Sequence, residues 1–116
     1  MEEPLLVDDF VKNMINKQFE KASLTYSNMT QNDKKNYIKQ RKDIVDYLKT
    51  KYEITFSKEY DHIQKLIVKF STPKYGYDGI YVLLTPNCVV YIGIINFENP
   101  HLQAWNFENF QDFLSF

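Results

Sequence analysis

The side chains that most often carry catalysis or bind metals are few in this chain and stand far apart. There are two histidines, His62 and His101, and one cysteine, Cys88. Hydrolysis and group transfer need an activated nucleophile or a paired acid and base, and a metal site needs clustered ligands. Neither histidine has a cysteine or second histidine at ligand spacing, and Cys88 has no base near it in sequence. The sequence therefore predicts no enzyme, no metal site and no cofactor, with packing roles for these side chains.

Two short motifs in the second half of the chain resemble those of a nuclease family. Gly79-Ile80-Tyr81 and Tyr91-Ile92-Gly93 spell GIY and YIG, separated by nine residues, and are similar to the hairpin signature of the GIY-YIG nucleases. The resemblance implies a hairpin followed by a helix with a catalytic arginine and, further on, a metal-binding glutamate. Here the single arginine, Arg41, precedes the motifs, so Glu98 and Glu108 lack the arginine partner. We therefore expect no cleavage of DNA or RNA, and a degenerate nuclease hairpin is the least favoured alternative.

Charge is distributed unevenly along the chain. The formal net charge is −1, yet all fourteen lysine and arginine residues lie at or before Lys74. Residues 1–74 include eleven acidic residues and carry +3, whereas residues 75–116 include four and carry −4. Such asymmetry steers a partner of opposite charge, although salt limits its reach to about 10 Å. The last third is the acidic end, and the overall balance does not favour a nucleic-acid-binding protein.

The acidic end also holds the best candidate binding site. Nine phenylalanines and nine tyrosines exceed what one small core needs, so some aromatic side chains are expected on the surface, where they suggest recognition. Trp105 lies in sequence among His101 and three carboxylates, which suits an aromatic anchor with acidic contacts to a basic protein. A core position for Trp105, with solvated acids around it, is the alternative. The predicted partner-binding residues are Asp78, Glu98, His101, Trp105, Glu108 and Asp112.

Two helices are predicted in the first half of the chain. Apolar residues at steps of three and four predict a helix over about residues 7–22, and residues 23–29 are predicted as a loop. Thr30, with Asp33 three residues later, has the form of a capping box and begins a helix over about 31–50. Acidic residues separate its lysines, which favours a solvated face over a nucleic-acid patch. Its buried stripe is predicted to comprise Tyr37, Ile38, Arg41, Ile44, Val45, Leu48 and Tyr52.

Four strands are predicted after these helices. Residues 52–57 alternate apolar and polar, and residues 63–70 fit either a helix or a strand, with their β-branched content favouring a strand. The uncharged residues 79–97 predict a buried hairpin with strands over 79–85 and 88–96, a turn at Thr85-Pro86-Asn87, and Val82 and Ile92 in the core. The break at Pro86 argues against a membrane span. Residues 96–106 are predicted as a loop and 107–116 as a short helix.

These elements predict a single α+β domain over residues 1–116. Two N-terminal helices pack on one face of a four-stranded antiparallel β-meander, and the short C-terminal helix covers the other face. Acidic residues at the start of the chain and the lone cysteine favour a cytoplasmic location.

Size, charge asymmetry and the missing catalytic groups favour a small protein-binding inhibitor with a basic protein partner. The closest functional type is a bacterial toxin-immunity protein, an antitoxin that covers the basic active site of a nuclease toxin. The alternative is a nucleic-acid-associated module that uses the lysines of the second helix.

Overall fold

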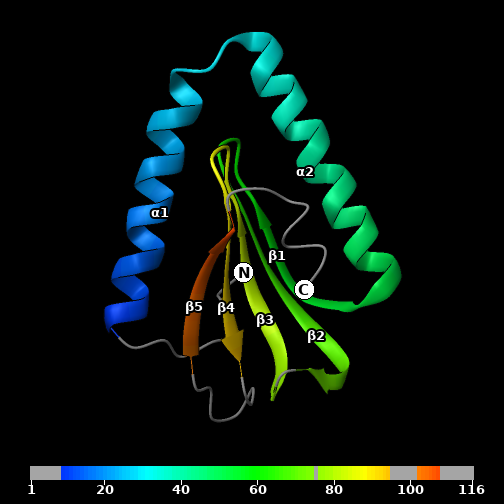
Figure 1. Cartoon of the computed structure of the whole chain (residues 1–116). Coiled ribbons are helices and arrows are strands. Elements are labelled where there is room, and N and C mark those ends of the chain that lie inside the picture. Colours follow the sequence, from blue (N-terminus) through cyan, green and yellow to red (C-terminus); the bar gives the residue numbers. More distant parts are fainter. Residues whose placement is uncertain (1–8, 75, 95–101, 108–116) are drawn as a thin grey trace.

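The fold is an antiparallel sheet with two helices (Figure 1). The computed structural model describes residues 9–74, 76–94 and 102–107. The elements in chain order are α1 (Asp9–Ser27), α2 (Gln31–Lys51), β1 (Glu53–Glu59), β2 (Gln64–Lys74), β3 (Tyr77–Leu84), β4 (Val89–Ile94) and β5 (Leu102–Phe107). Each strand pairs antiparallel with its sequence neighbours in the order β1-β2-β3-β4-β5. The predicted α+β meander is confirmed, with five strands in place of four.

The helix ends reflect both local and tertiary contacts. Thr30 caps α2 as predicted, because its Oγ1 accepts a hydrogen bond of 3.1 Å from the backbone N–H of Asp33. The predicted loop over 23–29 is wrong for residues 23–27, which continue α1. Buried Ala22 and a 2.9 Å hydrogen bond from Asn87 Nδ2 to Thr25 Oγ1 hold these last turns against the sheet, although they lack an apolar stripe.

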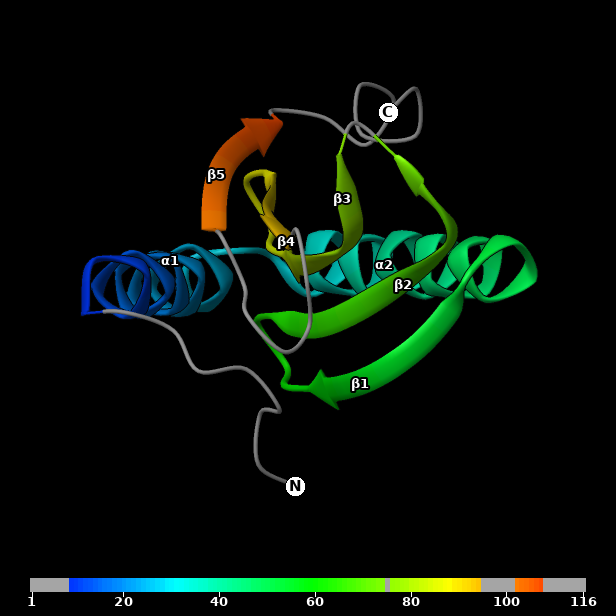
Figure 2. The same ribbon diagram turned by 90° about the horizontal axis from the view of Figure 1, so that it is seen from below.

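The two helices cover opposite faces of the sheet, as both views show (Figures 1 and 2). Successive residues of a strand point to opposite faces, so Val82 packs with Leu48 of α2 while its neighbour Tyr81 packs with Ile15 of α1. The prediction that both helices share one face is therefore wrong. The α2-side core comprises Ile44, Val45, Leu48, Leu66, Val68, Phe70, Ile80, Val82, Leu84 and Val89. The α1-side core comprises Ile15, Ala22, Phe56, Ile63, Ile67, Tyr81, Leu83, Val90, Ile92 and Ile94.

The central hairpin turns at the predicted residues. The backbone N–H of Thr85 donates to the carbonyl of Cys88 at 3.1 Å, and Pro86 and Asn87 occupy the middle of the turn. Thr85 Oγ1 accepts further hydrogen bonds from the N–H groups of Cys88 (2.9 Å) and Asn87 (3.3 Å). The predicted core residue Val82 is 0% exposed and Ile92 is 1% exposed. This hairpin is therefore the buried centre of the sheet.

Among the strands, the sequence prediction differs from the structure most at β2 and β5. Residues 64–70 are strand, as favoured, but β2 continues through Lys74 with a shift in register after Lys69. β5 lies in the region predicted as a loop and includes Phe107, so the loop and helix predictions are wrong for residues 102–107. The rest of the predicted C-terminal helix, 108–116, lies outside the described residues. In the part of the chain that the structure describes, no helix has the length and apolar character needed to cross a membrane.

Candidate functional site

The structure describes two of the six predicted partner-binding residues. Asp78 lies in β3 and is partly exposed, and Trp105 lies in β5 opposite Tyr91 of β4. Tyr91 in turn pairs with Val82, so Trp105 is displaced from Asp78 by about 13 Å along the strands and about 10 Å across them. Glu98, His101, Glu108 and Asp112 lie outside the described residues. Asp78 and Trp105 are therefore not neighbours in the sheet.

Basic residues gather at one end of the sheet. Lys58 lies in β1, and Lys65, Lys69 and Lys74 lie in β2. By contrast, β3, β4 and β5 contain no lysine or arginine, and Asp78 is the single charged residue in these three strands. Because the strands lie side by side in sequence order, the lysines of β1 and β2, together with Glu53 and Glu59, lie on the other side of the sheet from β4 and β5, which carry no charged residue.

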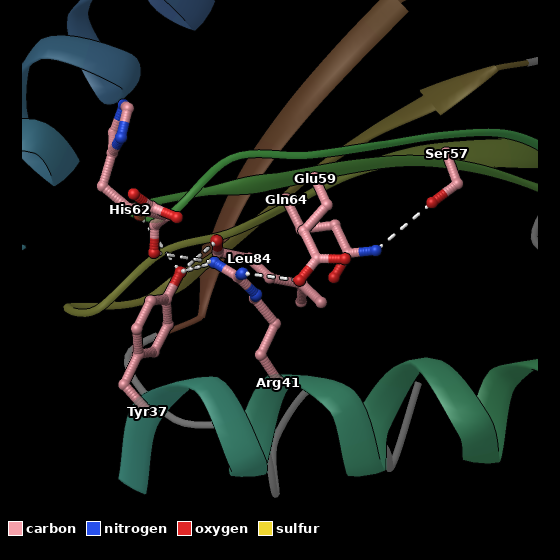
Figure 3. A network of polar contacts seen from close by, with 8 residues as sticks. Tyr37, Arg41, Ser57, Glu59, His62, Gln64 and Leu84 are labelled. Carbon is pink, nitrogen blue, oxygen red and sulfur yellow. Dashed lines mark hydrogen bonds and ion pairs between the residues drawn. The ribbon is translucent and has the colours of Figure 1, made fainter. Parts of the chain in front are cut away.

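A buried polar network joins α2 to the sheet, and Figure 3 shows Arg41 reaching from the helix toward the strands. The Arg41 side chain is 1% exposed. Its Nη1 donates hydrogen bonds to Tyr37 Oη (3.1 Å) and to the backbone carbonyl of Asp61 (3.3 Å), and its Nη2 donates to Glu59 Oε1 (3.3 Å). The Glu59 side chain is 65% exposed, so the ion pair joins a buried cation to a solvated carboxylate.

Tyr37 is the second centre of the network. Its hydroxyl lies 2.8 Å from the carbonyl oxygen of Leu84 and 3.1 Å from that of His62, and donates toward both. Burial raises the pKa of Tyr37 to about 12, although Arg41 acts in the opposite direction. The phenol therefore stays protonated and can keep donating. The sequence predicted Arg41 in the buried stripe of the helix but did not indicate its distant partners, the backbone carbonyl of Asp61 and the carboxylate of Glu59.

His62 takes a packing role on the opposite side of the sheet. Its ring lies 4.5 Å from the ring of Phe19 in α1 and 5.9 Å from that of Tyr60. Its Nε2 is buried without a hydrogen-bond partner among the described residues, and desolvation lowers the pKa of His62. Within the described ranges, no group of three or more His, Cys, Asp or Glu residues is placed to hold a metal ion.

The GIY and YIG tripeptides lie in adjacent antiparallel strands, as the resemblance implies. Tyr81 in β3 pairs with Ile92 in β4, and Ile80 pairs with Gly93. Tyr81 belongs to the α1-side core, whereas Arg41 projects from α2 toward the other face. The single arginine of the chain therefore lies across the sheet from the tyrosine of the GIY motif.

Two of the clefts that adjoin α2 lie beside its N-terminal half and beside Arg41. The first, of about 340 Å³, separates the N-terminal half of α2 from the β3–β4 turn, and the second, of about 270 Å³, lies beside Arg41. The first is lined by Met29, Asp33, Asn36, Tyr37, Gln40, Thr85, Pro86, Asn87, Cys88 and Val89. The second is lined by Ile38, Arg41, Lys42, Val45, Asp46, Lys49, Ser57, Glu59 and Gln64.

Comparison of the chain with protein-family models, with curated proteins and with solved structures gives no match.

Proposed function

We propose that this protein is a small inhibitor that binds a basic protein through the β5 end of its sheet. It would act in the cytoplasm by covering a basic active site, as a bacterial toxin-immunity protein covers a nuclease toxin, and without catalysis. The observation that carries the proposal is the sequence-ordered meander. This topology separates the lysines of β1 and β2 from three strands that contain no basic residue.

The position of Trp105 supports an interface at this end. β5 is the last strand of the described sheet and pairs with β4. In sequence, Glu98 precedes β5 by four residues and Glu108 follows it directly. Buried aromatic anchors contribute much of the binding energy of protein interfaces, whereas charges at the rim mainly accelerate association. A tryptophan in a terminal strand with acidic residues on both sides in sequence suits a basic protein partner.

The lysines of α2 support the nucleic-acid alternative less well. Lys34 lies over the ring of Tyr26, 4.9 Å from its centroid, and Lys51 lies 5.5 Å from the centroid of Tyr52. Each contact directs the ammonium group toward the protein's own ring. These two lysines are therefore not arranged in a row along the helix for a phosphate backbone.

The proposal is tested by recovering the partner and measuring its binding. Affinity purification from the native cell should recover a basic protein. With that partner, Trp105→Ala should weaken binding by about 2–4 kcal/mol, mainly through faster dissociation. Tyr47→Ala is the matched control, because Tyr47 is an aromatic residue of α2 that is 42% exposed. Circular dichroism checks that both variants keep the fold.

Two results would refute the proposal. In the first, Trp105→Ala binds the partner like the parent protein while charge reversal at Lys39 and Lys42 abolishes binding. In the second, the purification recovers nucleic acid in place of a protein, which supports the nucleic-acid alternative.

A further inference from the structure

The cleft beside Arg41 is lined by buried polar side chains and by charged side chains. Two of its lining residues, Arg41 and Gln64, are 1% and 6% exposed. Lys42 and Lys49 contribute two further positive charges from α2, against the carboxylates of Asp46 and Glu59. Buried polar side chains rarely line a cleft without a partner, because their desolvation is costly unless hydrogen bonds compensate for it.

The guanidinium of Arg41 has hydrogen-bonding capacity left for such a partner. A guanidinium has five N–H donors. Two belong to Nη1, which is bonded to Tyr37 and Asp61, and one of the two on Nη2 is bonded to Glu59. The second N–H of Nη2 and the N–H of Nε make no hydrogen bond to the described residues. Nε and Nη2 lie on one edge of the guanidinium, the kind of edge that binds carboxylate or phosphate oxygens in pairs, and Glu59 makes its single contact with Nη2 of this edge.

Glu59 occupies this site weakly. A well-formed hydrogen bond between a cationic N–H and a carboxylate measures about 2.7–2.9 Å, whereas the Glu59 contact is single and 3.3 Å long. Its side chain is 65% exposed, so Glu59 can exchange this contact for water, but Arg41 is 1% exposed and then requires another anion. Its carboxylate therefore acts as a tethered competitor that an external anion can displace.

A second donor lies on the sheet side of the cleft. Ser57 Oγ accepts a 3.2 Å hydrogen bond from Nε2 of Gln64, so its own O–H remains able to donate (Figure 3). The volume of about 270 Å³ is below the range of about 300–1,000 Å³ for drug-sized ligands. We propose that this cleft binds a small oxyanion, the carboxylate or phosphate group of a small molecule, between Arg41 and Ser57.

The single arginine of the chain makes the site directly observable. In a ¹⁵N-labelled sample the only arginine Nε–H signal belongs to Arg41. Sodium phosphate and sodium acetate are titrated separately at pH 7, with sodium chloride at equal ionic strength as the reference. We expect a saturable shift of the Arg41 signal in at least one oxyanion series, and the two series distinguish phosphate from carboxylate. A shift that chloride reproduces, or that does not saturate, indicates an adventitious ion only and overturns the proposal.

The competing role of Glu59 is tested with two variants that remove the same charge. Glu59→Gln should lower the dissociation constant of the oxyanion about fivefold, because it removes the internal competitor. Asp46 also lines the cleft but makes no hydrogen bond or ion pair with Arg41, so Asp46→Asn should change affinity by less than about twofold. Equal effects of the two variants would refute displacement of Glu59. Both positions are exposed, and circular dichroism checks that both variants keep the fold.

Discussion

At the scale of single residues, Tyr37 and Arg41 add polar contacts to the apolar packing of α2 on the sheet. Tyr37 donates to a carbonyl next to the β1–β2 turn and to one at the end of β3, and Arg41 adds the carbonyl of Asp61. The two side chains occupy one turn of α2, and neighbours at this spacing lie on the same face of a helix. The network therefore fixes where α2 sits along the strands as well as how firmly it is held.

The hydroxyl of Tyr37 should contribute measurably to stability. Tyr37→Phe leaves the carbonyl of Leu84 buried without this donor and is expected to lower the free energy of unfolding by about 1–3 kcal/mol. The parent protein should also lose stability as pH rises from about 10 to about 12. The unfolded chain releases the tyrosine proton near its ordinary pKa of 10.0, whereas folded Tyr37 keeps it to a pKa of about 12.

Urea denaturation at pH 8, 10 and 11 measures both effects. In Tyr37→Phe, the loss of stability that Tyr37 causes between about pH 10 and about pH 12 should be absent. Tyr26→Phe is the control, because the ring of Tyr26 packs 6.2 Å from that of Tyr37 and the substitution leaves the network intact. Equal destabilisation by the two variants would show that the hydroxyl of Tyr37 has no special role.

At the scale of the elements, β3 and β4 contribute side chains to both cores, one on each face of the sheet. Ile92 lies in the α1-side core and Ile44 in the α2-side core, on opposite sides of the sheet. Ile92→Ala should cost about 2–5 kcal/mol. The milder Ile92→Val and Ile44→Val should cost about 0.5–1.5 kcal/mol each, and their effects should add within about 0.5 kcal/mol.

Chemical denaturation of the two single variants and the double variant tests this additivity. Ile44→Val combined with Ile80→Val is the comparison, because both residues lie in the α2-side core, where coupling is expected. Strong coupling between Ile92 and Ile44 would contradict the two-sided architecture.

The elements that the sequence predicted correctly are those set by local chemistry. The cap at Thr30 and the turn at Pro86 depend on residues within four positions of each other. The end of α1 depends instead on Asn87, far along the chain. The sequence also did not indicate which face of the sheet each helix covers, because β3 and β4 are apolar on both faces. β5 was missed because its strand character comes from pairing with β4, and its own residues alternate weakly.

The same distinction between local and long-range interactions applies to the candidate sites. The acidic, aromatic end is a property of composition and was visible in the sequence. Arg41 was visible as a charged residue in an apolar stripe, but its partners lie 18 to 20 residues away in sequence on β1 and the β1–β2 turn. No local pattern indicates such a pairing.

At the scale of the whole molecule, charge separation should govern how fast the proposed partner binds. Glu98→Lys and Asp112→Lys should slow association at low salt and leave dissociation nearly unchanged, because rim charges act mainly on the encounter. Added salt should reduce the difference from the parent protein. Stopped-flow association at several salt concentrations measures this. Asp43→Lys on α2 makes the same change of charge elsewhere, and an equal slowing by this variant would show that only net charge matters.

The ordered meander also sets the order in which the parts of this domain can fold during synthesis. α1 and α2 leave the ribosome first, but helices of about 20 residues are marginal alone, and the strand that anchors both cores ends only at Leu84. At about 5–20 residues per second, the helices wait on the order of seconds for β3 after α2 is complete. β5 is added after both cores can close. A nascent chain therefore forms its proposed binding edge after the strands of both cores, when the part of the domain that supports it already exists.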